Sequence, residues 1–252
     1  MADKPLSVID LVTDGWRYGL DAVRRMPAVV GVGFVLVFVL NAVTLPLLPS
    51  FDEDLGLGSQ ALEFAQQIVQ GFLLTPVAIA VHRFVLLGEV TTHYALNPFV
   101  PRFFLFFVWT AILQLLVTIP SVPVAMAGQS EDIDAPFIVA LVLLFVALYI
   151  VLRLFILFPA IAVDARGAHW RNAFADTKGQ TLRVIGAVLL AAIPFLLVMV
   201  PAYVHLGWPT KDNFGPGIAF TVLYSAMYVL SVCVYAALAS KLFAALANKL
   251  KG

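Results

Sequence analysis

Long apolar runs are the feature of this sequence that most restricts its fold. Several of them extend for about 20 residues, which matches the roughly 30 Å hydrocarbon core of a bilayer at the 1.5 Å rise of an α-helix. Hydrophobic residues make up 62% of the 252 residues, and charged residues make up 12%. Soluble domains carry about twice that charged share. The sequence therefore predicts an all-α polytopic membrane protein.

The apolar runs predict six transmembrane helices, arranged as three hairpins in one membrane domain that covers residues 1–252. The predicted spans are residues 28–48, 61–81, 103–126, 136–163, 184–205 and 218–238. Apolar side chains also recur at helical spacing within residues 1–27, with charged residues between them. This pattern is typical of an amphipathic helix in the headgroup plane, although it also fits an ordinary surface helix. Ser7 and Asp10 resemble a capping pair at its start.

Basic residues are divided unevenly between the two sides of the predicted membrane. Of the 15 lysines and arginines, Arg153 lies inside a span and only Lys211 lies on the side opposite the termini. Acidic residues gather on that opposite side, in the loops around residues 52–54 and 131–134. Because cytoplasmic loops carry an excess of Lys and Arg, both termini are predicted to be cytoplasmic, in a bacterial inner membrane.

Basic and aromatic side chains are expected together at the cytoplasmic interface. The residues predicted there are Trp16, Arg17, Arg166, Trp170 and Arg171. Tryptophan favours the headgroup level, and basic side chains are attracted to the anionic lipids of the cytoplasmic leaflet. We therefore expect membrane lipids as partners, with a membrane protein complex or a homo-oligomer as the alternative. A net charge of zero argues against nucleic acid as a partner.

The sequence contains no pattern that indicates catalysis or metal binding. The four histidines, His82, His93, His169 and His205, lack the spacing of metal ligands, so we expect them at the surface or the interface. Cys233, the only cysteine, lies in an apolar run and is predicted to be an inert packing residue. Neither a nucleophile elbow nor a phosphate-binding glycine loop occurs. We therefore expect no metal, no cofactor and no enzymatic activity.

The ends of the second and fourth predicted spans resemble each other. Pro76 and Arg83 match Pro159 and Arg166 at an offset of 83 residues. We interpret the chain as three repeated units, each with an interfacial helix, a span out and a span back. Such units would be arranged about an axis along the membrane normal. Chance similarity between apolar helices is the alternative.

Polar residues inside the spans are the candidate site. Arg153 lies ten residues before the predicted end of its span, about 15 Å from the cytoplasmic side. Its equivalent in the repeat is Gln70, and Glu63, Gln66, Gln67 and Gln70 have the spacing of one helical face. One hypothesis is a polar cavity between the second and fourth spans, where Arg153 holds an anionic group of a lipid or solute. The other is hydrogen bonding between helices, with Arg153 reaching to the interface.

One stretch of the chain resembles a known family. It consists of Arg153–Val163, an amphipathic segment and then Thr177-Lys178-Gly179 before a span. This arrangement resembles the membrane domain sometimes fused to glycerophosphoryl diester phosphodiesterases, which in bacteria also occurs as a stand-alone multi-pass protein. The resemblance covers roughly residues 150 to 190. It implies a fold and a membrane location but no phosphodiesterase activity, because no soluble segment is long enough for a catalytic barrel.

Taken together, these patterns favour a non-enzymatic role. We expect a membrane-organising or accessory protein that binds lipid or a partner membrane protein. A small carrier of a lipid or an amphipathic solute is the alternative. A wet, continuous cavity would favour the carrier, whereas dry packing of Gln70 against Arg153 would favour the scaffold.

Overall fold

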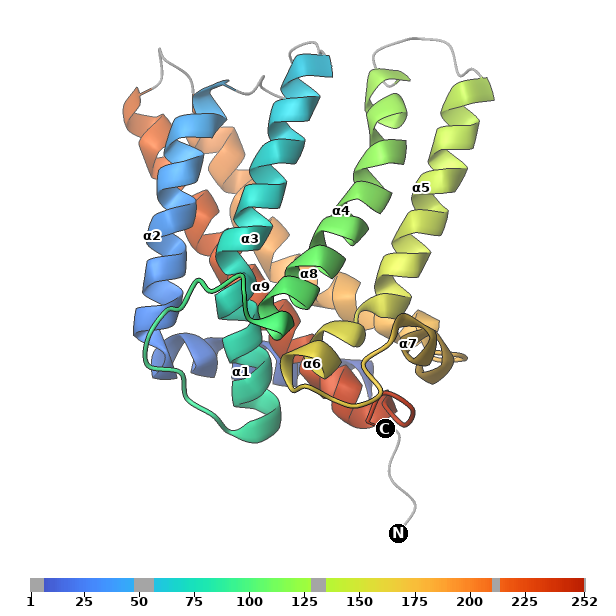
Figure 1. Cartoon of the computed structure of the whole chain (residues 1–252). Coiled ribbons are helices and arrows are strands. Elements are labelled where there is room, and N and C mark those ends of the chain that lie inside the picture. Colours follow the sequence, from blue (N-terminus) through green and yellow to red (C-terminus); the bar gives the residue numbers. More distant parts are fainter. Residues whose placement is uncertain (1–6, 48–56, 128–134, 210–213, 252) are drawn as a thin grey trace.

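A computed structural model describes residues 7–47, 57–127, 135–209 and 214–251, which form helices, the segments between them and a C-terminal turn (Figure 1). The acidic loops predicted around residues 52–54 and 131–134 lie outside the described residues. In chain order the elements are α1 (Val8–Arg25), α2 (Pro27–Thr44), η1 (Leu45–Leu47), α3 (Leu57–Leu87), α4 (Pro101–Ala127), α5 (Ala135–Leu154), α6 (Leu157–Ala162), α7 (Trp170–Asp176), α8 (Thr181–Leu206) and α9 (Phe214–Leu246).

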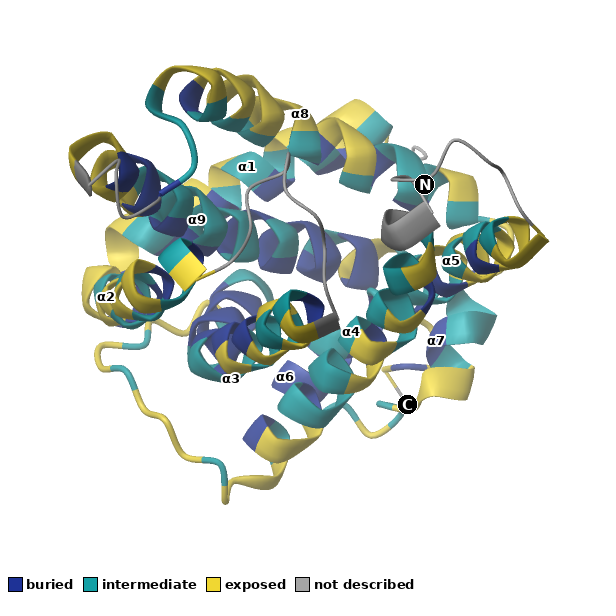
Figure 2. Cartoon of the chain, turned by 90° about the horizontal axis from the view of Figure 1, so that it is seen from above, coloured by how far each residue is buried: buried dark blue, intermediate teal, exposed yellow. Residues whose placement is uncertain are grey.

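Six segments within the described residues are long and apolar enough to cross a membrane, so the chain is a multi-pass membrane protein. Sequence neighbours α2 and α3, α4 and α5, and α8 and α9 pack against each other, which confirms the three predicted hairpins. Helix α9 also packs against α1, α3 and α6, and buried residues concentrate at the centre of the bundle (Figure 2). Large apolar side chains on α5 and α8 face outward, where lipid would cover them.

The fourth predicted span is not one continuous helix. Helix α5 ends at Leu154, and α6 begins at Leu157 and turns across the base of the bundle (Figure 1). Pro159 has no N–H to donate to the carbonyl of Phe155, and a proline ring also clashes with the residue four positions earlier. The predicted helix 136–163 therefore breaks close to Arg153. This corrects the expected depth of Arg153, which lies in the last turn of α5 and not in the middle of a span.

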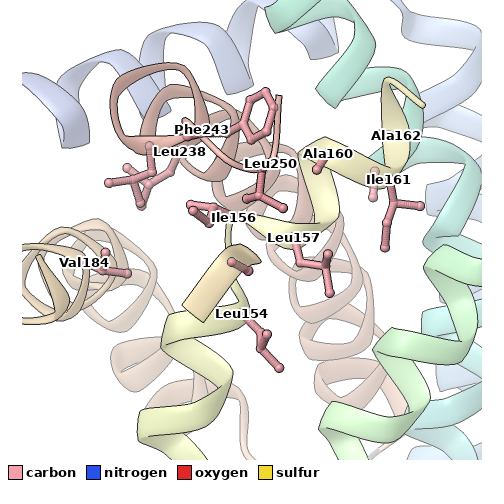
Figure 3. Close-up of a cluster of buried hydrophobic side chains, with 14 of the residues drawn as sticks. Leu154, Ile156, Leu157, Ala160, Ile161, Ala162, Val184, Leu238, Phe243 and Leu250 are labelled. Atoms are coloured by element: carbon pink, nitrogen blue, oxygen red, sulfur yellow. The ribbon is translucent and has the colours of Figure 1, made fainter. Parts of the chain in front are cut away.

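Helix α6 belongs to the buried core at the base of the molecule. Figure 3 shows its residues beside the end of α9 and the C-terminal turn, with Leu154 on α5 below them. Ile156, Leu157 and Ala160 are completely buried, and so is Leu250 near the C-terminus. Burial of this apolar surface stabilises the turn between α5 and α6.

The segment between α3 and α4 differs from what the predicted repeat implies. Pro76 lies inside α3, which continues as a helix to Leu87. Residues 88–100 then contain no helix, so the second unit lacks the interfacial helix expected of it. Proline therefore has different consequences at the two matching positions, Pro76 and Pro159.

Helix α1 lies across the lower ends of the spans (Figure 1). Ser7 Oγ accepts a hydrogen bond from the Asp10 N–H at 3.0 Å, which confirms the predicted cap. The small residues Gly15 and Gly19 face α9: a Cβ added at Gly19 would lie 2.8 Å from the Val234 Cα. The buried face of this amphipathic helix thus packs closely on protein, and Asp14 pairs with Lys241 of α9 at 3.3 Å, while Arg17 and Arg24 are exposed.

Candidate functional site

Arg153 connects the end of α5 to α7. Its Nε donates to Thr177 Oγ1 at 3.1 Å and its Nη1 donates to the Tyr149 hydroxyl at 3.0 Å. Its Nη2 donates to the carbonyl of Phe174, and the guanidinium also lies 4.8 Å from the centre of the Phe174 ring. Cations stabilise the C-terminal end of a helix, so this arginine holds the last turn of α7 in place.

A buried hydrogen-bond network joins α2, α3 and α9 near the opposite end of the bundle. Gln66 and Gln70 of α3 donate to Asn41 Oδ1 at 2.8 and 2.6 Å. Asn41 Nδ2 in turn donates to Ser225 Oγ at 2.9 Å. Asn41 and Ser225 are completely buried. These bonds are of the kind that links helices inside a membrane.

The other two residues of the predicted polar face lie apart from this network. Gln67 Nε2 donates to Glu63 Oε1 at 3.1 Å, and both residues line a small cavity between α3 and α4. No hydrogen bond of the described residues connects Gln70 to Arg153. The four predicted site residues therefore lie in three separate places. Arg153 lies at the α5–α7 junction, Gln70 lies in the buried network, and Glu63 and Gln67 lie at the small cavity between α3 and α4.

A cavity of about 250 Å³ lies between α3, α4 and α9, with Phe155 and Phe158 of the α5–α6 bend on its wall. It extends along about three turns of α3, or roughly 16 Å, from Gly71 to His82. Among the described residues, its lining is predominantly apolar and contains no charged side chain. Sequence reasoning missed this cavity, because it depends on how helices distant in the sequence pack.

His82 lies at the lower end of this cavity and is only 2% exposed. The prediction that it lies at the surface or interface is wrong, because α3 continues beyond it and presents this face to α9. Its Nδ1 lies 2.8 Å from Ser240 Oγ, which donates its own proton to the Ala236 carbonyl. A serine hydroxyl has one proton, so His82 Nδ1 is the donor. In a catalytic serine–histidine pair the ring nitrogen instead accepts the serine proton.

The opposite end of the cavity contains Gln114 of α4, whose side-chain amide is only partly hydrogen-bonded. Gln114 Nε2 donates to the carbonyl of Gln67 at 3.2 Å, but its Oε1 is buried and accepts no hydrogen bond from the part of the chain that the structure describes. Gln114 and Gly71 both line the cavity at this end. A buried amide oxygen without a donor is unfavourable, so this end can accept a donor from water or a ligand.

Charged residues at the base connect α3, α4 and the turn after α6. Arg83 pairs with Glu89 at 2.6 Å and donates to the carbonyl of Ala162 at 3.1 Å. Asp164 pairs with Arg102 and lies 3.7 Å from Arg83. The resulting cluster balances its charges, so it holds the segments together without attracting a further ion.

Tyr94 attaches the segment 88–100 to α3. Its hydroxyl donates to the Leu73 carbonyl at 2.6 Å. Burial raises the pKa of Tyr94 to about 12, so the phenol keeps the proton that this hydrogen bond needs. The C-terminal turn is attached in a similar way: the Asp176 carboxylate accepts the backbone N–H groups of residues 248, 249 and 250 at 3.0, 3.1 and 2.9 Å.

The predicted interfacial residues differ in their surroundings. Trp16 is half-buried and stacks on Phe195 of α8 at 4.7 Å between ring centres, so its ring packs α1 against the bundle. Arg17, Arg166 and Arg171 are exposed, as is Trp170. The Arg171 guanidinium lies 5.3 Å from the centre of the Trp170 ring. These four side chains remain accessible to a membrane surface.

No family model, curated protein or solved structure matches this chain. The resemblance of residues 153–163 and 177–179 to a phosphodiesterase-associated membrane domain therefore stays a prediction. Within the described ranges, no three His, Cys, Asp or Glu side chains lie close enough to hold a metal ion.

Proposed function

We propose that this multi-pass membrane protein is a non-enzymatic, lipid-binding accessory protein. The observation that carries the proposal is the uncharged cavity between α3, α4 and α9. A cavity with an apolar lining and few polar groups is the usual form of a site for an apolar ligand. Inside a membrane the molecules available to fill it are lipids.

Arg153 is a less favourable position for the lipid. Three of its nitrogens already donate to protein oxygens on α5, α7 and the α7–α8 turn. The exposed residues Arg17, Arg166, Trp170 and Arg171 add a basic and aromatic surface at the same end as α7. Each such basic side chain contributes about 1 kcal/mol of attraction to an anionic leaflet, so this end is proposed to face the cytoplasm of a bacterium.

Filling the cavity tests the proposed function. Val232 lines it, whereas Val222 is exposed on the same helix α9. Native mass spectrometry of protein extracted from its membrane should show wild type carrying lipid. Val232→Phe should carry about tenfold less, since the added ring occupies space that a lipid chain needs. Val222→Phe should match wild type.

Two results would count against this function. The absence of lipid on wild-type protein would contradict the proposal that the cavity binds lipid. Equal retention by wild type and Val232→Phe would place the bound lipid elsewhere, and Arg153→Ala would then identify an anionic headgroup site at the α5–α7 junction.

A further inference from the structure

The lower end of the central cavity offers a hydrogen-bond acceptor without a partner. His82 Nδ1 donates to Ser240 Oγ, so in this neutral tautomer Nε2 carries a lone pair and no proton. The hydrogen bond to Ser240 uses Nδ1 and the ring also interacts with the Ala236 carbonyl, which leaves Nε2 without an assigned hydrogen-bond partner among the described residues; His82 lines the cavity and is 2% exposed. A ligand at this position must therefore supply a donor to be stabilised.

The absence of charge in the lining restricts the ligand further. Burying a phosphate or a carboxylate without a cation is strongly unfavourable. Arg83, the residue after His82, is engaged with Glu89, Asp164 and the Ala162 carbonyl and does not line this cavity. The lining therefore favours an uncharged molecule.

The orientation of the cavity matches that of a lipid in the leaflet at this end. His82 lies five residues before the end of α3, about 8 Å along the helix axis. Phe106, whose ring centre is 5.8 Å from that of His82, lies in the second turn of α4. From there the cavity extends toward Gly71 and the middle of the bundle. A headgroup at His82 would thus lie near the membrane surface, with its chain directed inward.

We propose that the cavity binds a neutral lipid with a free hydroxyl group, of the diacylglycerol or prenol class. The hydroxyl donates to His82 Nε2, and one chain lies along α3 between Thr75 and Gly71. This proposal rests on the lipid-binding function above and specifies the chemistry of the bound lipid.

Two probes that differ only in the hydroxyl test this proposal. Wild-type protein is mixed with equal amounts of dioctanoylglycerol and its O-methyl ether, and bound probe is measured by native mass spectrometry. Dioctanoylglycerol should be retained about tenfold more, which is the preference that one buried hydrogen bond confers. Equal retention of both probes would overturn the hydroxyl assignment and leave lipid binding intact. Retention of neither would overturn both.

Two substitutions of His82 make the test specific to Nε2. In His82→Asn the amide nitrogen takes the place of Nδ1, so the donor to Ser240 is kept and the Nε2 acceptor is lost. In His82→Gln the amide oxygen takes the place of Nε2. We expect the asparagine variant to retain the two probes equally and the glutamine variant to keep the preference. A preference for dioctanoylglycerol in the asparagine variant together with equal retention of both probes by the glutamine variant would overturn the proposal.

A third probe separates neutral from anionic lipids. Dioctanoyl phosphatidylglycerol, added in equal amount, should not displace dioctanoylglycerol from the wild type, because the lining has no cation. Displacement by this phospholipid would show that charge does not limit the site, and it would contradict the proposal.

Discussion

At the scale of single residues, Asn41 is the centre of the buried hydrogen-bond network that joins α2, α3 and α9. It is the acceptor for two glutamine side chains and the donor to Ser225, with none of its surface exposed. Asn41→Leu keeps the volume but leaves the Gln66 and Gln70 amides without that acceptor. We expect a loss of about 1–3 kcal/mol in unfolding free energy, measured by denaturant titration in detergent.

The control for Asn41 is a lipid-facing position of the same helix. Val43 is 63% exposed, so Val43→Leu should leave the unfolding free energy unchanged. A stable Asn41→Leu variant would mean that the network contributes specificity of packing and little stability.

At the scale of elements, the contact between α1 and α9 depends on glycine. A Cβ at Gly19 would lie 2.8 Å from the Val234 Cα, which is backbone and cannot rotate away. Gly19→Leu should therefore separate α1 from α9 and expose the neighbouring Cys233, which is now completely buried. We expect maleimide to label Cys233 about tenfold faster in this variant, because local opening controls access to a buried thiol.

Gly31 provides a matched control for Gly19. It lies on α2 with no atom within 4 Å of an added Cβ. Gly31→Leu should label as slowly as wild type. Slow labelling of Gly19→Leu as well would indicate that α1 can shift without opening the core around Cys233.

At the scale of the whole molecule, the even number of spans puts α1 and the end of α9 on one side. Lys178 is exposed on that side, and His205 is exposed near the other end of α8. A membrane-impermeant maleimide applied to intact cells should label His205→Cys and spare Lys178→Cys if the basic side faces the cytoplasm as proposed. The buried Cys233 keeps background labelling low. Labelling of Lys178→Cys alone would reverse the proposed orientation.

Several features could be predicted from sequence because they depend on local properties. Length and hydropathy determine the six spans, and the spacing of apolar residues and Ser7 determines α1 and its cap. The inward face of α3 is also local, since Gln66 and Gln70 recur four residues apart. Their partner Asn41 could have been suspected as an isolated polar residue in an otherwise apolar span, but its contact with α3 depends on helix packing.

The remaining features depend on tertiary packing. Proline stays inside a helix at position 76, whereas at position 159 it follows a helix break, and the turn there places Leu157 and Ala160 in the buried core at the base. That turn moves Arg153 from the predicted middle of a span to the α5–α7 junction. It also contributes to the wall of the central cavity. Sequence determined that this chain crosses the membrane and which faces are polar. The packing of α3, α4 and α9, whose contacts join residues far apart in the chain, decided where a ligand could bind.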